Sequence, residues 1–174
     1  MTEATAIQLA DYQPFSHIVQ NVDLTFRLGP KATRVTAILH LATNPARPGP
    51  NDLRLDGENL TLIRAVLNGQ PLSLIPDATG LTIPHAALPT TPFTLETEVE
   101  IAPEGNTALE GLYMSNGLYC TQCEAEGFRK ITFYPDRPDV MAPFKVRIEC
   151  DLPILLSNGN PITSGAGFAE WQDP

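Results

Sequence analysis

Cysteine is scarce in this sequence, with three thiols in 174 residues. An odd number of cysteines in a chain of this size argues against a disulfide framework, which small secreted domains use to compensate for a small core. The chain is long enough to bury a core without covalent cross-links. We therefore expect a single domain, residues 1–174, in the reducing environment of the cytoplasm.

Basic residues are also few. Eleven Lys and Arg stand against 20 Asp and Glu, which gives a formal net charge of -9, and no cluster of basic residues interrupts this excess. The negative charge repels phosphate backbones and anionic lipid headgroups. No stretch is apolar for long enough to span a bilayer, and residues 1–15 lack the basic and apolar segments of a signal peptide. We expect neither nucleic acid nor a membrane as a partner.

Several catalytic motifs are missing. The sequence has no His-Glu-x-x-His helix, no Gly-x-Ser-x-Gly elbow and no glycine-rich phosphate loop. His17, His40 and His85 do not have the spacing of metal ligands, so each is interpreted as structural. The sequence therefore predicts no catalytic residue and no metal ligand in this chain.

One Cys-x-x-Cys pair is present, at Cys120 and Cys123. Such a pair can be half of a zinc site or a redox couple. Only Cys150 remains as a further thiol ligand, and residues three apart on a strand point to opposite faces. The pair also lacks the strand–helix context that lowers the pKa of a redox thiol. We interpret these cysteines as buried structural thiols.

Alternation of apolar and polar residues dominates the chain and predicts half-buried strands. The 17 prolines favour strand ends and turns over long helices. Asn68-Gly69 and Asn116-Gly117 have the composition of type I′ hairpin turns. A single helical turn is expected within residues 130–137. The class is therefore all-β with mostly antiparallel strands, either a sandwich or a partly open barrel. The predicted strands cover residues 22–28, 35–41, 93–101, 144–151 and 168–172.

Carboxylates recur on the expected solvent faces. Glu96, Glu98 and Glu100 alternate with apolar residues and predict a row of surface charges. Gln122, Glu124 and Glu126 share one face if that stretch stays extended. From spacing alone, these three are either a solvated strand face or a carboxylate cluster that awaits a cation.

Three segments in this order give a more specific signal: residues 106–113 (NTALEGLY), 121–129 (TQCEAEGFR) and 134–139 (YPDRPD). Together with residues 23–26, 155–160 and 171–174, they resemble the N-terminal domain of the aminopeptidase N family of gluzincin zinc metallopeptidases, especially its bacterial members. The resemblance covers nearly the whole chain. It implies a saddle-like β-domain that packs against a catalytic domain, which is absent from this sequence.

The resemblance also assigns roles. The Gln-x-Glu motif of the family matches Gln122 and Glu124, which implies that Glu124 binds the α-ammonium of a peptide and that Gln122 lines the pocket for its first side chain. Glu126 has no family role, and Arg129 is expected to be structural and paired with a carboxylate. Zinc, its His-Glu-x-x-His helix and a second amine-binding carboxylate would belong to the remainder of the intact enzyme. This chain alone is expected to be inactive and to bind no metal.

Two alternatives stay open at this point. Within the resemblance, relatives of this group include an epoxide hydrolase and non-catalytic scaffold proteins, although the Gln-x-Glu match favours the peptidase. The chain could be a free-standing β-sandwich binding module in which Gln122 and Glu124 are ordinary surface residues. Continuation of the protein past Pro174 into a catalytic domain favours the aminopeptidase interpretation, and termination there favours the binding module.

Overall fold

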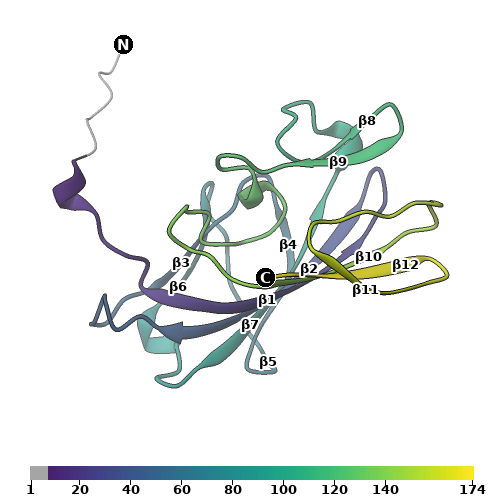
Figure 1. Cartoon of the computed structure of the whole chain (residues 1–174). Coiled ribbons are helices and arrows are strands. Elements are labelled where there is room, and N and C mark those ends of the chain that lie inside the picture. Colours follow the sequence, from purple (N-terminus) through teal and green to yellow (C-terminus); the bar gives the residue numbers. More distant parts are fainter. Residues whose placement is uncertain (1–7) are drawn as a thin grey trace, which may run out of the picture.

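The alternating segments form one large twisted sheet in the computed structural model, which describes residues 8–174 (Figure 1). Residues 1–7, part of the N-terminal stretch without signal-peptide features, lie outside the described residues. The strands are β1 (His17–Arg27), β2 (Thr33–Thr43), β3 (Leu53–Asp56), β4 (Thr61–Leu67), β5 (Gln70–Pro71), β6 (Gly80–Ile83), β7 (Phe93–Ile101), β8 (Gly111–Ser115), β9 (Leu118–Gln122), β10 (Phe144–Glu149), β11 (Asn160–Gly165) and β12 (Phe168–Asp173).

The large sheet has the strand order β11-β12-β10-β1-β2-β7-β4-β5. Neighbouring strands within this sheet are antiparallel, except that β1 and β10 run parallel, with Val22 opposite Phe144. The pairs β3–β6 and β8–β9 form two small separate sheets. The all-β prediction with mostly antiparallel strands is confirmed, and the large sheet stays open instead of closing into a barrel.

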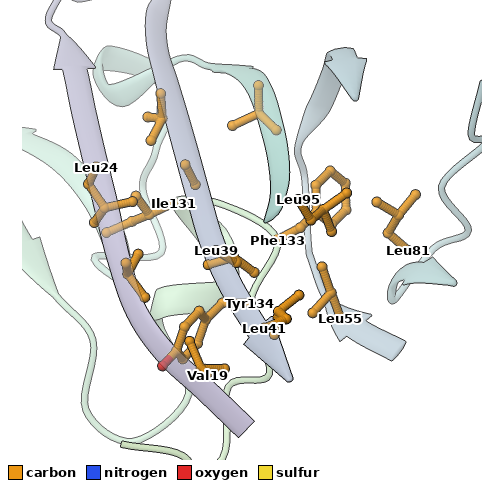
Figure 2. Close-up of a cluster of buried hydrophobic side chains, with 14 of the residues drawn as sticks. Val19, Leu24, Leu39, Leu41, Leu55, Leu81, Leu95, Ile131, Phe133 and Tyr134 are labelled. Atoms are coloured by element: carbon orange, nitrogen blue, oxygen red, sulfur yellow. The ribbon is translucent and has the colours of Figure 1, made fainter. Parts of the chain in front are cut away.

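The core lies on one face of the large sheet. Every second residue of β2 and β7 is buried, as the alternation requires. Leu55 and Leu81 of the small β3–β6 sheet reach the same cluster, as do Ile131 and Phe133 from the segment before β10 (Figure 2). The stretch that follows residue 130 is therefore anchored in the core.

The opposite face of the sheet carries the predicted row of carboxylates, and arginines of neighbouring strands pair with them. Arg34 Nε lies 3.0 Å from Glu100 Oε2, and Arg64 Nε lies 2.8 Å from Glu98 Oε2. Arg64 also pairs with Glu96. Part of the surface charge is thus balanced across strands, although exposed pairs of this kind each contribute little to stability.

Turn chemistry agrees with the structure at both Asn-Gly sites. Asn68 and Gly69 have φ values of 48° and 79°, and Asn116 and Gly117 have 49° and 82°, as a type I′ turn requires. The two turns join β4 to β5 and β8 to β9.

The helical turns differ from the prediction in number and position. Within residues 8–174 there are four three-residue 3-10 turns where at most one was expected: η1 (Leu9–Asp11), η2 (His85–Ala87), η3 (Pro103–Gly105) and η4 (Phe128–Lys130). The turn predicted over residues 130–137 is wrong, because η4 ends at Lys130. Asp56 and Tyr134 then exchange backbone hydrogen bonds of 2.8 and 3.1 Å, which draws the chain into an extended conformation. Among the described residues, no helix is long and apolar enough to cross a bilayer.

Candidate functional site

The candidate site lies where the β8–β9 hairpin ends. Strand β9 stops at Gln122, and residues 124–126 form a turn that is closed by a 2.8 Å hydrogen bond from Gly127 N to the carbonyl of Cys123. The peptide bond between Glu124 and Ala125 is cis. The extended conformation considered for residues 122–126 is therefore wrong, and Glu124 and Glu126 do not share a strand face.

Two glycines allow this turn to pack closely against the hairpin. A Cβ atom on Gly127 would lie 2.4 Å from the carbonyl oxygen of Gln122. A Cβ atom on Gly111, whose φ is +71°, would lie 2.7 Å from Cβ of Lys130. Such distances are far inside van der Waals contact, so both positions require glycine. The start of β8, the end of β9 and η4 consequently form one tightly packed unit.

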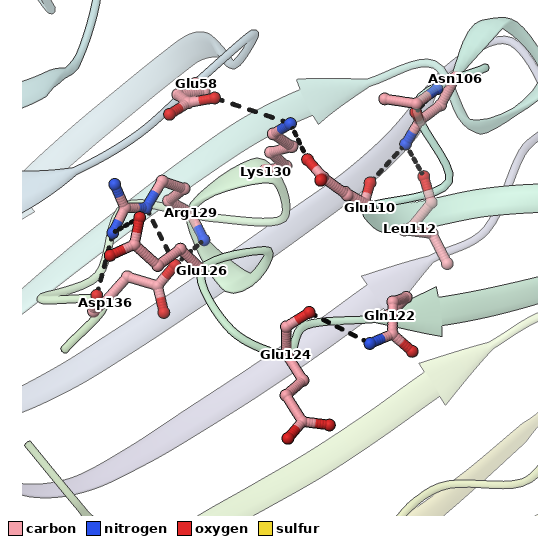
Figure 3. Close-up of polar contacts among 11 residues, drawn as sticks. Glu58, Asn106, Glu110, Leu112, Gln122, Glu124, Glu126, Arg129, Lys130 and Asp136 are labelled. Carbon is pink, nitrogen blue, oxygen red and sulfur yellow. Dashed lines mark hydrogen bonds and ion pairs between the residues drawn. The ribbon is translucent and has the colours of Figure 1, made fainter. Parts of the chain in front are cut away.

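Gln122 and Glu124 are brought together by this turn. The Gln122 side-chain amide donates a 3.2 Å hydrogen bond to the backbone carbonyl of Glu124 (Figure 3). Both side chains are exposed. Within residues 8–174, the Glu124 carboxylate has no hydrogen-bond or ion-pair partner, and Figure 3 shows it pointing away from the basic residues of η4. It is therefore available to a cation from outside the chain.

Glu126 has a partner. One of its carboxylate oxygens lies 3.5 Å from Arg129 Nη2. Arg129 in turn donates from Nε to Asp136 Oδ2 at 3.1 Å and from Nη2 to the Asp136 carbonyl at 3.0 Å (Figure 3). The prediction that Arg129 pairs with a carboxylate is confirmed. Asp136 also receives support from β3, because its backbone N–H donates to Asp56 Oδ2 at 3.0 Å.

A second set of contacts fixes the other side of the unit. Lys130 forms ion pairs with Glu110 and, at 3.7 Å, with Glu58. The Asn106 side-chain amide donates to the backbone carbonyls of Glu110 and Leu112, at 2.7 and 2.9 Å (Figure 3). These contacts hold the approach to β8, so the turn that carries Glu124 is braced from both flanks.

The cysteines and histidines show no sign of a metal centre. Cys120, Cys123 and Cys150 are free thiols, and each is half-buried, so the expectation of fully buried thiols is wrong. Partial burial, with a smaller effect of Asp136, raises the pKa of Cys123 to about 11. His17 is buried, and His40 Nε2 lies 3.0 Å from Asp23 Oδ2. Within residues 8–174, no group of three or more His, Cys, Asp or Glu side chains could hold a metal ion.

Apart from Arg129, the sequence alone did not identify the residues that brace the site. Gly111, Gly127 and Asp136 lie inside the three family-like segments, but each acts through a tertiary contact that alternation does not report: Gly111 with Lys130, Gly127 with Gln122, and Asp136 with Arg129 and Asp56. The sequence does carry one signal, because Gly111 and Gly127 stand on either side of the Gln-x-Glu motif. Glycine is required where two backbones approach closely.

Comparison with known proteins decides the family. Residues 74–172, more than half of the chain, match the family model of the Peptidase M1 N-terminal domain. The chain belongs to this family. Aminopeptidase N of Caulobacter vibrioides is 49% identical to this M1 N-terminal domain, in an alignment that covers 97% of the present chain. Aminopeptidase N of Escherichia coli is 43% identical, and its alignment covers 94% of the present chain. The resemblance stated from the sequence is thereby confirmed.

Solved structures agree with this assignment. The crystal structure of Legionella pneumophila aminopeptidase A in complex with aspartic acid superposes on 96% of this M1 N-terminal domain with a TM-score of 0.85 and 34% identity. Native yeast LTA4 hydrolase superposes on 90% with a TM-score of 0.74, and at 19% identity it supports the fold alone. The chain spans about a fifth of the length of the curated relatives, 20% and 19% for the two named above.

Proposed function

We propose that this chain is the substrate-recognition domain of a zinc-dependent aminopeptidase that removes N-terminal amino acids from peptides. In this proposal the Glu124 carboxylate binds the α-ammonium of the substrate, and Gln122 lines the pocket for the first side chain. The observation that supports it best is the exposed, unpaired carboxylate of Glu124 on a turn that is braced on both flanks.

The chemistry of an exopeptidase gives such a carboxylate a purpose. The positive amine distinguishes a peptide's N-terminus from every internal position, so a fixed negative charge recognises a chain end. Glu126 is partly neutralised by Arg129, whereas Glu124 is not. A charge pair at Glu124 would fix where the first peptide carbonyl lies, which is a positioning contribution to catalysis.

Zinc is part of this proposal only for the intact enzyme. The residues described here do not fit a zinc site, because no group of three possible ligands occurs among residues 8–174. We therefore assign no chemical step through zinc to this chain. The 174-residue chain on its own is expected to hydrolyse no peptide and to bind no stoichiometric zinc, and elemental analysis that finds one tightly bound zinc per chain would overturn this expectation.

The decisive experiment uses the intact enzyme and two matched variants. Glu124→Gln keeps the shape of the side chain and removes its charge, and it should lower kcat/KM on peptides with a free N-terminus by a factor of about 30 to 5,000, equivalent to about 2–5 kcal/mol. Glu126→Gln, two residues away and already paired, should change kcat/KM by less than about threefold. A kcat/KM for Glu124→Gln close to that of the wild type would contradict the assignment of Glu124 as the ammonium-binding residue.

A second readout tests recognition of the amine directly. An N-acetylated peptide lacks the positive charge, so the wild-type enzyme should strongly prefer the free peptide. Glu124→Gln should reduce this preference, because the lost partner of the ammonium was the source of discrimination. An unchanged preference would assign amine recognition to another group.

The remaining proposals follow the same interpretation. The partners are peptide N-termini and a catalytic domain of the same protein, and the cytoplasm is the proposed location. The alternative of a free-standing binding module is not favoured, because the chain belongs to the M1 N-terminal domain family. In addition, 97% of the chain aligns with part of a much longer aminopeptidase N.

A further inference from the structure

The turn that carries Glu124 lies between two elements, and different contacts hold each of them. The element before the turn is β9, which pairs with β8 along its whole length and ends at Gln122. The element after the turn is η4, a 3-10 turn of three residues. A helix this short does not hold its conformation alone, because nucleation costs more than so few hydrogen bonds return. The position of η4 therefore depends on what its side chains contact.

The three residues of η4 are anchored in three different ways. Phe128 packs edge-on against Tyr134 and Phe144, with ring centroids 5.0 and 5.7 Å apart. Apolar burial is non-directional, so these contacts hold η4 against the core without fixing its orientation. Lys130 pairs with carboxylates through one ammonium group, a compact charge on a flexible stem. Arg129 has a planar guanidinium whose donors point in fixed directions, so it is the anchor that fixes orientation.

Arg129 is held through both its backbone and its side chain. Its backbone N–H and its Nε donate to Oδ2 of Asp136 at 3.0 and 3.1 Å, and its Nη2 donates to the Asp136 carbonyl at 3.0 Å (Figure 3). The carbonyl of Arg129 accepts the backbone N–H of Glu58 at 3.0 Å. Asp136 is in turn held by Asp56, the last residue of β3. The orientation of η4 is thus set by the end of β3, which lies outside the β8–β9 hairpin.

We propose that Arg129 is a positioning residue for the Glu124 carboxylate, an inference that rests on the proposed role of Glu124 in binding the substrate ammonium. Gly127 adjoins η4 and donates its backbone N–H to the carbonyl of Cys123 at 2.8 Å. The close approach of Gly127 to Gln122 leaves the turn no room to move independently of η4. A displaced η4 would therefore displace Glu124, and a misplacement of about 1 Å can cost about 100-fold in rate.

A lysine at position 129 separates geometry from charge. It keeps the positive charge beside Asp136 but cannot donate from two fixed positions at once, as the guanidinium does. Arg137→Lys is the matched control, because Arg137 donates from Nε and Nη2 to the two carboxylate oxygens of Asp139, both at 2.8 Å. Its further contact is the backbone carbonyl of Gln13, which lies before β1 and not in the Glu124 turn.

The test is a double-mutant cycle in the intact enzyme. The value of kcat/KM on a peptide with a free N-terminus is measured for Arg129→Lys and Arg137→Lys, each alone and combined with Glu124→Gln, at a temperature where every variant is folded. Arg129→Lys alone should lower kcat/KM by a factor of about 10 or more, and Arg137→Lys by less than about twofold. In the Glu124→Gln background, Arg129→Lys should change kcat/KM by less than about twofold, because its effect passes through the carboxylate that has been removed.

A merely structural role of Arg129 would give a different pattern. General loosening of the enzyme would lower kcat/KM by the same factor in both backgrounds, and this result would overturn the proposal. A kcat/KM for Arg129→Lys close to that of the wild type would overturn it as well. In both cases a large loss for Glu124→Gln alone would leave the proposed function in place. If Glu124→Gln alone has no effect, the ammonium-binding role is wrong, and the positioning role is overturned with it.

A second variant tests the same pair from the other side if Arg129→Lys does not fold. Asp136→Asn keeps an acceptor oxygen for Arg129 and removes the charge, so its hydrogen bonds are weaker but not lost. We expect kcat/KM to fall by at least about threefold in the wild-type background and to stay within about twofold in the Glu124→Gln background. Equal losses in the two backgrounds would overturn the proposal.

Discussion

The Nε of Arg129 donates a 3.1 Å hydrogen bond to Oδ2 of Asp136, and the same carboxylate oxygen accepts the backbone N–H of Arg129 at 3.0 Å. Only 17% of the Arg129 side chain and 11% of the Asp136 side chain are exposed. The pair joins η4, directly after the turn of Glu124, to the segment that bonds with Asp56 of β3. A local turn is in this way tied to a strand far away in the sequence.

Removing one partner of this pair should be costly. Arg129→Met leaves the mostly buried Asp136 carboxylate without its cation, and we expect a loss of about 3 kcal/mol in the free energy of unfolding. Arg27→Met is the control, because Arg27 pairs with Glu149 at 3.1 Å but is 56% exposed, and the loss there should be below about 1 kcal/mol. Urea denaturation of the 174-residue chain measures both. Equal losses would mean that the Arg129 pair does not brace the fold.

The close approach at Gly127 gives a second prediction. Gly127→Ala places a methyl group 2.4 Å from the carbonyl oxygen of Gln122, so the turn must shift, at a cost of about 1–3 kcal/mol in the free energy of unfolding. Gly105→Ala is the control, since nothing lies within 4 Å of its added Cβ. It should leave stability unchanged or slightly raised. A Gly127→Ala protein as stable as Gly105→Ala would contradict the packing described here.

Much of the fold could be predicted from the sequence because its causes are local. Alternation along residues 22–28 and 93–101 reports which face of a strand is buried, and the structure follows it residue by residue in β1 and β7. The Asn-Gly turns depend only on the positive φ that these residues tolerate.

The parts that were missed depend on contacts between distant residues. The parallel pairing of Val22 with Phe144 and the hydrogen bond between Asp56 and Asp136 leave no periodic signal in either segment. The same holds for the turn after Gln122, whose geometry is set by Gly111 and Gly127. Spacing therefore suggested a continued strand, and the role of Glu124 came from the family resemblance.

The thiol of Cys123 should be unreactive in the folded chain. Burial raises its pKa to about 11, from the ordinary value of 9.0, so the thiolate fraction at pH 8 is about 100-fold lower than in the unfolded chain. We expect alkylation by iodoacetamide to be at least about tenfold slower in the folded than in the urea-unfolded protein, since a more basic thiolate is also more nucleophilic. Mass spectrometry of the digested protein measures the alkylation. The signal that is lost in Cys123→Ser is the one assigned to Cys123. Equal rates in the two states would return the Cys-x-x-Cys pair to consideration as a redox couple.

His17 makes stability depend on pH near neutrality. Its ring lies between Phe15 and Phe93, with centroid distances of 6.1 and 6.0 Å, and its Nδ1 is 2.9 Å from Ser16 Oγ. Burial, with a smaller effect of His85, lowers the pKa of His17 below the ordinary value of 6.5. Between that lowered pKa and 6.5, the unfolded chain binds a proton that the folded chain does not. Stability is therefore lost as the pH falls through 6.5, by up to about 1.4 kcal/mol per pH unit.

The measurement is the free energy of unfolding in urea at pH 7.5 and pH 5.5. His17→Gln removes the titrating ring, so its free energy of unfolding should fall less between these two pH values than that of the wild type. His85→Gln is the control: it keeps the buried His17, and burial is the larger cause of the shift, so it should retain most of the wild-type dependence. If His17→Gln loses as much stability as the wild type between the two pH values, another group is responsible, and the interpretation of His17 as a neutral, buried ring at neutral pH is wrong.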